Sequence, residues 1–214
     1  MAKFNVFNRE YGWIELICGP MFAGKSEELL RKIKRLEYAD VDCLLFKPKI
    51  DTRNKSLIKS RNGKKMLAIE FDDPFEIYDV LSKNVNHPQV VAIDEIQFAD
   101  PKIIEVVEVL AKKGIIVYAA GLDNDFRNNP FPITSSLASM AEHITKLSAI
   151  CTECGAPGTC TQRIIDGEPA SFNSPIFLIG NIESYTVRCR NHHEITDKKF
   201  SKKSDKFIKN YKEI

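Results

Sequence analysis

The sequence predicts an α/β fold in which a parallel sheet is flanked by helices, and three observations lead to this prediction. Short apolar runs alternate with helically spaced apolar residues from about residue 13 to residue 147, as in proteins whose parallel strands are joined by helices. The run at 89–94 is apolar between its end residues, as expected of a central strand buried on both faces. A glycine-rich octapeptide at 19–26 links the first apolar run to the first helical segment. Such a fold has its binding site at the carboxyl ends of the strands.

The individual elements are expected in the following order. Strands are predicted at the apolar runs 13–18, 42–47, 89–94, 115–121 and 143–147. Helices are predicted at 29–36, 74–81, 103–114 and 135–142, where apolar residues recur at helical spacing or proline opens a first turn. The Asn62-Gly63 dipeptide favours a tight turn and predicts a short hairpin between residues 56 and 70.

The character of the chain changes after about Ala149, where cysteine, glycine and proline increase and helical periodicity ends. We therefore expect an α/β domain over residues 1–149, a small subdomain over 150–195 and a lysine-rich tail over 196–214. For this tail a solvated segment or short exposed helix is favoured over a nucleic-acid patch, because acidic residues interrupt the lysines at Asp197, Asp205 and Glu213.

Composition narrows the classes of function. The chain has 214 residues, 43% of them hydrophobic, and a formal net charge of +2, so nothing points to nucleic acid or an anionic membrane. The N-terminus lacks the apolar core of a signal peptide, and no apolar run is long enough to span a bilayer. A soluble, cytoplasmic protein is expected. In that reducing compartment the six cysteines suit metal binding or burial rather than disulfides, and Cys18, Cys43 and Cys160 are expected as buried thiols.

The octapeptide matches the Walker A pattern G-x-x-x-x-G-K-[ST] between a strand and a helix. In such a loop, backbone N–H groups and a helix N-terminus point at one spot and bind phosphate. Lys25 would reach the β- and γ-phosphates, and Ser26 would hold Mg²⁺. A chance match is the alternative, and the flanking strand and helix argue against it. The eight residues are Gly19, Pro20, Met21, Phe22, Ala23, Gly24, Lys25 and Ser26.

Two acids, Asp94 and Glu95, follow the apolar run at 89–94 as in a Walker B sequence. The first would help to hold Mg²⁺, and the second would orient or deprotonate the attacking group. The alternative is a pair of solvated acids at a strand end. Arg53, in the polar loop Asp51-Thr52-Arg53, is a candidate for the further cation that phosphoryl transfer needs, although spacing alone fits a surface arginine equally well.

Two C-x-x-[CH] pairs, Cys151/Cys154 and Cys189/His192, supply four ligands suited to a closed tetrahedral Zn²⁺ site. Such a site leaves no open position for substrate, so the expected zinc is structural. The alternatives are buried free cysteines, or His193 as the fourth ligand. The matched spacing of the two pairs favours His192.

Four aromatic residues lie near the expected strand ends. Taken singly, each fits the core as well as a ligand site. As a set they are suited to sandwich a flat heterocycle. They are Phe98, Phe126, Phe131 and Tyr185.

Together these residues resemble the type II, cytosolic-type thymidine kinase family over roughly residues 12–195. The resemblance rests on the octapeptide 19–26, Asp51-Thr52-Arg53, the string 94–98, Gly121-Leu122-Asp123 with Phe126 and Pro130-Phe131, and both zinc pairs. It implies a RecA-like P-loop sheet with a C-terminal zinc subdomain that carries a long loop, the lasso, from about residue 156 to 180.

The resemblance also implies roles for residues. Glu95 would be the general base for the thymidine 5′-hydroxyl, and Lys25 and Arg53 would stabilise the transferred phosphoryl. Asp94 and Gln97 would join the P-loop in holding Mg-ATP, and Asp51 would lie near the sugar. The remaining residues would line the base, with main-chain groups of 176–180 facing it: Met21, Phe98, Leu122, Phe126, Phe131, Thr161, Ile176, Phe177, Leu178, Ile179, Gly180 and Tyr185.

Physical reasoning then predicts specificity. Backbone groups that satisfy O4 and N3–H of thymine would be left unpaired by cytosine, so deoxyuridine should be a substrate and deoxycytidine should not. The resemblance further implies a homotetramer and feedback inhibition by dTTP. Two departures from the family pattern are Ala23 in place of serine and His192 in place of cysteine.

Two other classes compete with this interpretation. A RecA-like DNA-dependent ATPase with a zinc ribbon would account for the Walker sequences and the cysteines, but the near-neutral charge argues against it. A non-catalytic nucleotide switch would leave the acid at Glu95 without a purpose.

Overall fold

A computed structural model describes residues 12–49, 57–59, 65–85, 87–176, 185–199 and 201–211. Its centre is a six-stranded parallel sheet with the strand order β5-β2-β6-β7-β1-β8. The predicted α/β class with a parallel sheet is therefore confirmed. The strands are β1 (Ile14–Gly19), β2 (Cys43–Pro48), β5 (Ile69–Phe71), β6 (Val90–Ile93), β7 (Ile116–Leu122) and β8 (His143–Lys146).

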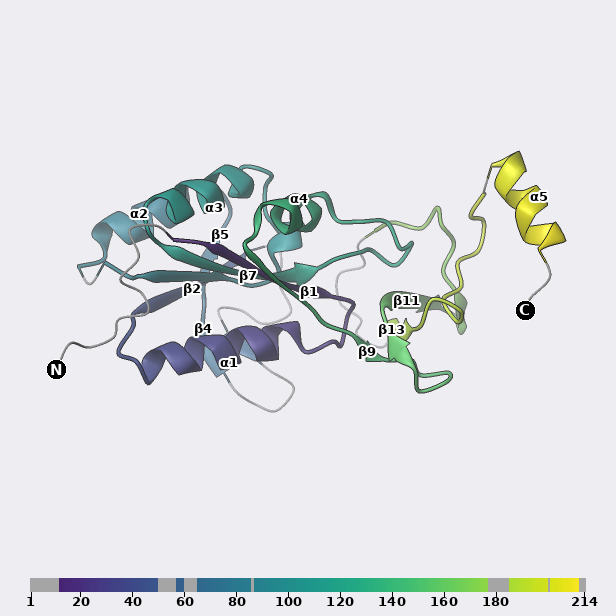
Figure 1. The fold of residues 1–214 in the computed structure, drawn as a ribbon, viewed down its shortest axis with the longest axis horizontal. Coiled ribbons are helices and arrows are strands. Elements are labelled where there is room, and N and C mark those ends of the chain that lie inside the picture. Colours follow the sequence, from purple (N-terminus) through teal and green to yellow (C-terminus); the bar gives the residue numbers. More distant parts are fainter. Residues whose placement is uncertain are drawn as a thin grey trace.

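Helices cover both faces of the sheet (Figure 1). One face packs against α1 (Lys25–Glu37), and the other carries α2 (Glu76–Lys83), α3 (Ile103–Lys112) and α4 (Pro132–Met140). The short 3₁₀ helix η1 (Ile96–Phe98) follows β6. Because the central strands β6, β7 and β1 lie between two helical layers, their apolar runs need no polar face, whereas the edge strand β8 is largely exposed.

The period-two geometry of the strands divides the core into two clusters. On β1, Leu16 packs toward α3 and α4 while Ile17 packs toward α1. On β6, Val91 belongs to the cluster on the side of α3 and α4, and Val90 belongs to the cluster on the side of α1. The α1 side is completed by the helical stripe that the sequence predicts, which is Leu29, Leu30, Ile33 and Leu36.

The chain after the sheet forms small antiparallel pairs beyond the carboxyl ends of the strands (Figure 1). The strands are β9 (Ala149–Ile150), β10 (Pro157–Gly158), β11 (Cys160–Ile165), β12 (Glu168–Pro169) and β13 (Tyr185–Arg188). The expected boundaries at residues 149 and 195 stay a prediction.

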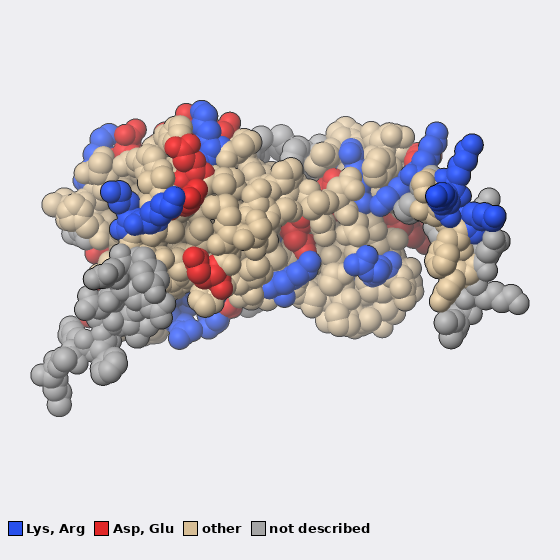
Figure 2. Space-filling model, turned by 45° about the horizontal axis from the view of Figure 1, so that its top comes forward, with Lys and Arg blue, Asp and Glu red and all other residues tan. Residues whose placement is uncertain are grey.

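Helix α5 (Lys202–Asn210) lies at the far end of the molecule from α2 (Figure 1). Figure 2 shows Lys and Arg gathered at this end, whereas both signs of charge are mixed over the other end of the face in view. In helix α5, the lysines Lys202, Lys203 and Lys206 are exposed. The prediction of a short exposed helix in this tail is therefore confirmed. Among the helices of the described segments, none combines the length and apolar character needed to cross a bilayer.

Three predicted boundaries are wrong. The helix predicted over 74–81, with Pro74 in its first turn, is formed by Glu76–Lys83 with Phe75 as its N-cap. The expected hairpin forms from β3 (Leu57–Lys59) and β4 (Lys65–Leu67), but residues 69–71 form β5, a separate strand parallel to β2. The helix expected at 135–142 begins three residues earlier, at Pro132. Proline is suited to the first helical position, since its fixed φ fits a helix and its missing N–H has no intrahelical partner there.

Candidate functional site

The glycine-rich octapeptide connects β1 to α1 as the sequence predicts. Gly19 ends the strand with φ 149°, and a Cβ atom there would lie 2.4 Å from the Leu147 carbonyl oxygen. Gly24 is the N-cap of α1 and has φ 83°. Both positions need glycine, because a side chain would clash or would strain the backbone. The loop therefore brings the N-terminus of a 13-residue helix to the carboxyl edge of the sheet, an arrangement that suits anions.

Lys25 lies in the first turn of this helix, and its Nζ atom donates to the Pro20 carbonyl oxygen at 2.8 Å. The ammonium group is thus folded back over the loop. Ser26 follows, and its side chain hydrogen-bonds the Asp94 carboxyl group. The two halves of the candidate phosphate site, the loop after β1 and the acid after β6, are therefore in direct contact.

Asp94 is only 4% exposed, at the end of a central strand. Burial, together with the nearby charge of Glu95, raises the pKa of its carboxyl group from 3.8 to about 7. The Glu95 backbone N–H donates to its Oδ1 atom at 3.0 Å. A buried carboxyl of this kind gains from a cation close by, as in sites where a metal ion sits beside the phosphates.

Glu95 adopts the left-handed conformation (φ 52°, ψ 37°) as the residue that precedes η1, a rare conformation for a residue with a side chain. Gln97 holds its carboxylate, because Gln97 Nε2 donates to Glu95 Oε2 at 2.6 Å. The Oε1 atom of the same amide accepts a hydrogen bond from the Leu122 backbone N–H at 3.0 Å. A Cβ atom on Gly121 would lie 2.6 Å from Gln97 Oε1, so glycine on β7 leaves room for this bridge.

The four predicted aromatic residues divide into two groups. Phe98 and Phe131 meet edge to face, with ring centroids 6.5 Å apart and planes at 81°. Phe126 is buried, and Tyr185 is half-buried at the start of β13. The guanidinium of Arg163 joins the second group, since it lies 5.1 Å from the Phe126 ring centroid and 5.9 Å from that of Tyr185.

Strand β11 connects the small antiparallel sheet to the main domain. The Met21 backbone N–H in the phosphate loop donates to Thr161 Oγ1 at 3.1 Å. Two residues further on, Arg163 reaches Phe126. Alternate residues of a strand share a face, so Thr161 and Arg163 both project toward the main domain from β11. The predicted residues Met21 and Thr161 are thus brought together.

Sequence reasoning did not single out Arg163 or Arg127. The Arg127 guanidinium lies 5.3 Å from the Phe126 ring centroid, and it donates to the Ser174 carbonyl oxygen. Residues 161–163 read Thr-Gln-Arg and show no apolar alternation. The only available signal was the two-residue spacing of Arg163 from Thr161, which puts both side chains on one face if the segment is a strand.

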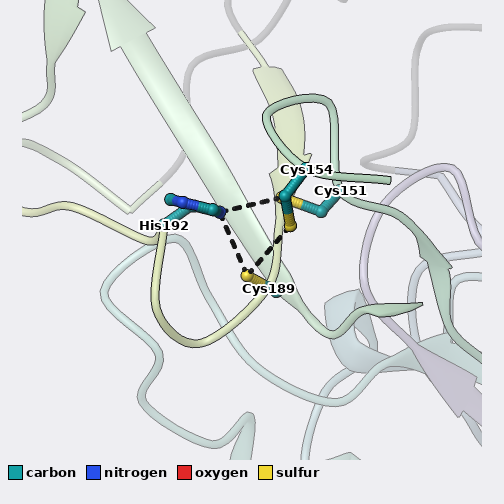
Figure 3. A group of neighbouring side chains, drawn as sticks. All are labelled: Cys151, Cys154, Cys189 and His192. Carbon is teal, nitrogen blue, oxygen red and sulfur yellow. Dashed lines mark hydrogen bonds between the residues drawn. The ribbon is translucent and has the colours of Figure 1, made fainter. Parts of the chain in front are cut away.

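The predicted metal ligands form one cluster, in which all four ligand atoms lie within 4.8 Å of one another. The Cys154 and Cys189 Sγ atoms are 3.8 Å apart, and His192 Nδ1 lies 3.4 Å from Cys189 Sγ and 3.7 Å from Cys151 Sγ (Figure 3). A tetrahedral zinc with Zn–S of about 2.3 Å and Zn–N of about 2.0–2.1 Å requires ligand separations of roughly 3.5–3.8 Å. The three separations of 3.4, 3.7 and 3.8 Å agree with this geometry, and all four atoms lie within 4.8 Å of one another, so the cluster is suited to a tetrahedral zinc ion.

His193 takes no part in this cluster, because its ring Nε2 lies 2.9 Å from the Phe126 carbonyl oxygen. Burial lowers the pKa of its imidazole, so the neutral ring acts there as a hydrogen-bond donor. Of the two histidines left open by the sequence, the structure brings His192 to the cysteines. Cys18 and Cys160 are buried as expected, and Cys43 is half-buried.

Some predicted site residues lie outside the described residues. They are Asp51, Arg53, Phe177, Leu178, Ile179 and Gly180. Ile176, the last described residue before that segment, is 39% exposed.

Comparisons with known proteins were consistent with one another. A family model described as thymidine kinase matches residues 12–193. The chain is 48% identical over 208 residues to a thymidine kinase of Mycoplasmoides gallisepticum, which covers 97% of this chain and 92% of that protein. It is 46% identical over 215 residues to a thymidine kinase of Ureaplasma parvum serovar 3, with 99% and 96% covered.

Among solved structures, the flagellar accessory protein FlaH from Methanocaldococcus jannaschii is similar at 14% identity and a TM-score of 0.45. The match covers 69% of this chain and 76% of that chain.

Proposed function

The chain belongs to the thymidine kinase family, and from that premise we propose that it transfers the γ-phosphoryl group of ATP to the 5′-hydroxyl of thymidine, giving dTMP. The observation that carries this proposal is the direct contact between the phosphate loop and the acid pair. Ser26 hydrogen-bonds Asp94, and Glu95 follows at the same edge of the sheet. A phosphate-binding loop next to a candidate base is what a kinase requires.

Glu95 is proposed as the general base. Its carboxylate is the acceptor that would take the proton of the 5′-hydroxyl as that oxygen attacks the γ-phosphorus. The Gln97 amide fixes one carboxylate oxygen at 2.6 Å, which orients the carboxylate. The sequence suggested Gln97 as a residue that helps to hold Mg-ATP, and its hydrogen bonds to Glu95 and Leu122 support a positioning role beside it.

Lys25 and the loop N–H groups are proposed to bind the β- and γ-phosphates. In this proposal Lys25 leaves the Pro20 carbonyl, where its Nζ lies at 2.8 Å, and reaches the phosphates. Ser26 and Asp94 would hold Mg²⁺, which would neutralise charge on the phosphoryl oxygens. The residues fit that ion because Asp94 is a buried acid whose pKa is raised in the absence of a cation. Arg53 is proposed as a further cation, and Asp51 as a neighbour of the sugar.

The nucleoside is proposed to bind among Met21, Phe98, Leu122, Phe131 and Thr161, with Phe126 and Tyr185 near the base. Main-chain groups of residues 176–180 would satisfy O4 and N3–H of thymine. Deoxyuridine is then a substrate, because losing one methyl contact costs about 1–3 kcal/mol. Deoxycytidine is rejected, since it would leave buried donors and acceptors unpaired.

The zinc ion is proposed to be structural, because the four ligands Cys151, Cys154, Cys189 and His192 close its coordination shell. It would fix the small sheet that carries Thr161. The proposal includes a lasso over residues 156–180, a homotetramer, inhibition by dTTP, and a cytoplasmic role in deoxynucleoside salvage. Free cysteines in a zinc-binding arrangement suit a reducing compartment.

The test compares acceptors and variants. Purified protein with Mg-ATP receives thymidine, deoxyuridine, deoxycytidine, single-stranded DNA or no acceptor, and ADP release is followed. We expect ADP release with thymidine and deoxyuridine only, and a loss of about a hundredfold or more in kcat for Glu95→Gln. Glu108→Gln, an exposed acid on α3 that pairs with Lys112, is the matched control. ADP release stimulated by DNA but not by thymidine would instead favour a DNA-dependent ATPase.

A further inference from the structure

Arg163 is a buried cation without an acidic partner in the described part of the chain. Its side chain is 1% exposed, and its Nε atom has no hydrogen-bond partner. Burying a charge is costly unless other groups compensate for the lost water. A buried charge that costs stability is often found at a functional site. The groups that surround the Arg163 guanidinium indicate which function it serves.

Within the described segments, the guanidinium of Arg163 contacts two aromatic rings and one carbonyl oxygen. It lies over the rings of Phe126 and Tyr185, at 5.1 and 5.9 Å from their centroids, and its Nη1 atom donates to the Pro175 carbonyl oxygen at 2.5 Å. The negative faces of aromatic rings stabilise a desolvated cation. These contacts account for the burial of the charge, and they tie together three separate segments of the chain.

Each of these segments contributes to the proposed nucleoside site. Phe126 follows β7, and Tyr185 begins β13 directly opposite Arg163 in the strand register. Pro175 immediately precedes Ile176, the first residue of the segment proposed to face the base. The Arg163 side chain therefore contacts two rings that are proposed to lie near the base, and it also contacts the carbonyl group of Pro175.

Arg127 reinforces this arrangement from the other side. Its guanidinium lies 5.3 Å from the Phe126 ring centroid and 5.3 Å from that of Phe172. It also donates to the Ser174 carbonyl oxygen. Adjacent carbonyl groups, those of Ser174 and Pro175, are thus held by two arginines that both lie over one phenylalanine ring. The chain leading to residue 176 is fixed relative to Phe126.

The phosphate loop is held differently. Within the described segments, its contact with β11 is the hydrogen bond from the Met21 N–H to Thr161 Oγ1. The Arg163 guanidinium instead contacts Phe126, Tyr185 and the Pro175 carbonyl oxygen. A change at Arg163 should therefore disturb one substrate site more than the other.

We propose that Arg163 is a positioning residue for the nucleoside: it fixes Phe126, Tyr185 and the Pro175 carbonyl, and so shapes the pocket for the base without contributing to ATP binding. This inference rests on the proposed function, since it assigns Arg163 to the thymidine site of that reaction. The residue acts through its neighbours and does not touch the reacting atoms.

The experiment measures two Michaelis constants in matched variants. Arg163→Met removes the charge but keeps the length of the side chain. Arg163→Lys keeps the charge and can still reach the Pro175 carbonyl, but it lacks a planar group that stacks on rings. Arg31→Met, at an arginine on α1 whose side chain is 52% exposed, is the control. Zinc content and the thermal midpoint are measured for every variant.

We expect Arg163→Met to raise KM for thymidine about tenfold while KM for ATP stays within about twofold. Arg163→Lys should show a smaller rise in the same constant, and Arg31→Met no change. A purely structural arginine would lower the thermal midpoint without separating the two constants. Equal changes in both constants, or an unchanged KM for thymidine in a folded variant, would overturn the inference.

If Arg163→Met does not fold, the Arg163→Lys variant decides the question. Its KM for thymidine should rise while its KM for ATP does not. The unmodified enzyme distinguishes the two levels of the argument. If it forms no dTMP, the proposed function fails and the inference fails with it. If it forms dTMP and the Arg163 variants match it in KM for thymidine, only the inference about Arg163 is wrong.

Discussion

Replacing Asp94 with asparagine should stabilise the ligand-free protein while it destroys activity. The Asp94 carboxyl group is 4% exposed at the end of β6. Burial, and the neighbouring Glu95 charge, raise its pKa from 3.8 to about 7. Without a cation, the ionised group is therefore unfavourable in the folded protein at neutral pH. Asparagine has the same shape, cannot ionise, and can still hydrogen-bond both Ser26 and the Glu95 N–H.

The sign of the pH dependence follows from proton binding. Between about pH 4 and pH 7 the folded state keeps a proton on Asp94 that the unfolded chain has released, so stability falls as the pH rises through this window. The rise of the Asp94 pKa from 3.8 to about 7 corresponds to about 4 kcal/mol of stability, of which about 2–3 kcal/mol is lost between pH 5 and pH 8. The advantage of Asp94→Asn over the unmodified protein should grow by that amount.

Urea unfolding of the zinc-loaded protein without nucleotide or magnesium, at pH 5 and pH 8, measures this difference. Asp79→Asn, at an exposed acid on α2, is the control and should show no such change with pH. The same Asp94→Asn variant should lose about a hundredfold or more in kcat, because a neutral amide holds Mg²⁺ poorly. A stability difference that is constant between the two pH values would refute the raised pKa.

Three further predictions concern the site and the core. Gln97→Met should cost about 1–3 kcal/mol in unfolding free energy, because the Leu122 N–H loses its buried partner, and should also lower kcat; unchanged kcat in this variant would argue against orientation of Glu95. Cys154→Ser should reduce bound zinc below one ion per chain and lower the thermal midpoint, measured by metal analysis and calorimetry; full zinc content would contradict the proposed ligand set. Ile33→Ala should cost about 2–5 kcal/mol in urea unfolding with both KM values unchanged; a loss below about 1 kcal/mol would contradict the close packing of α1 on the sheet.

The sequence predicts the sheet and the phosphate loop well, for physical reasons that are local. The run 90–93 is apolar because both of its faces are buried, and Gly19 and Gly24 stand where the backbone admits no side chain. The zinc cluster is equally predictable, since each ligand pair lies within one short turn. A local constraint of this kind leaves a local pattern.

Contacts between distant segments were less predictable. The sequence predicts residues 69 and 70 as part of the hairpin, whereas the structure has them in the separate strand β5. A strand of three residues is too short for the sequence pattern to show that it pairs with β2. The bridge from Glu95 through Gln97 to Leu122 joins η1 to β7, and sequence spacing does not encode it. Arg163 is not predicted, for the same reason. Its guanidinium packs on the ring of Phe126, which is 37 positions away in the sequence.

The most direct test of the central claim is to identify the product. Unmodified protein is incubated with Mg-ATP and thymidine, and the nucleotides are separated and quantified. We predict one dTMP for each ADP formed, with no product when deoxycytidine replaces thymidine. ADP without dTMP, or equal turnover of deoxycytidine, would contradict the account.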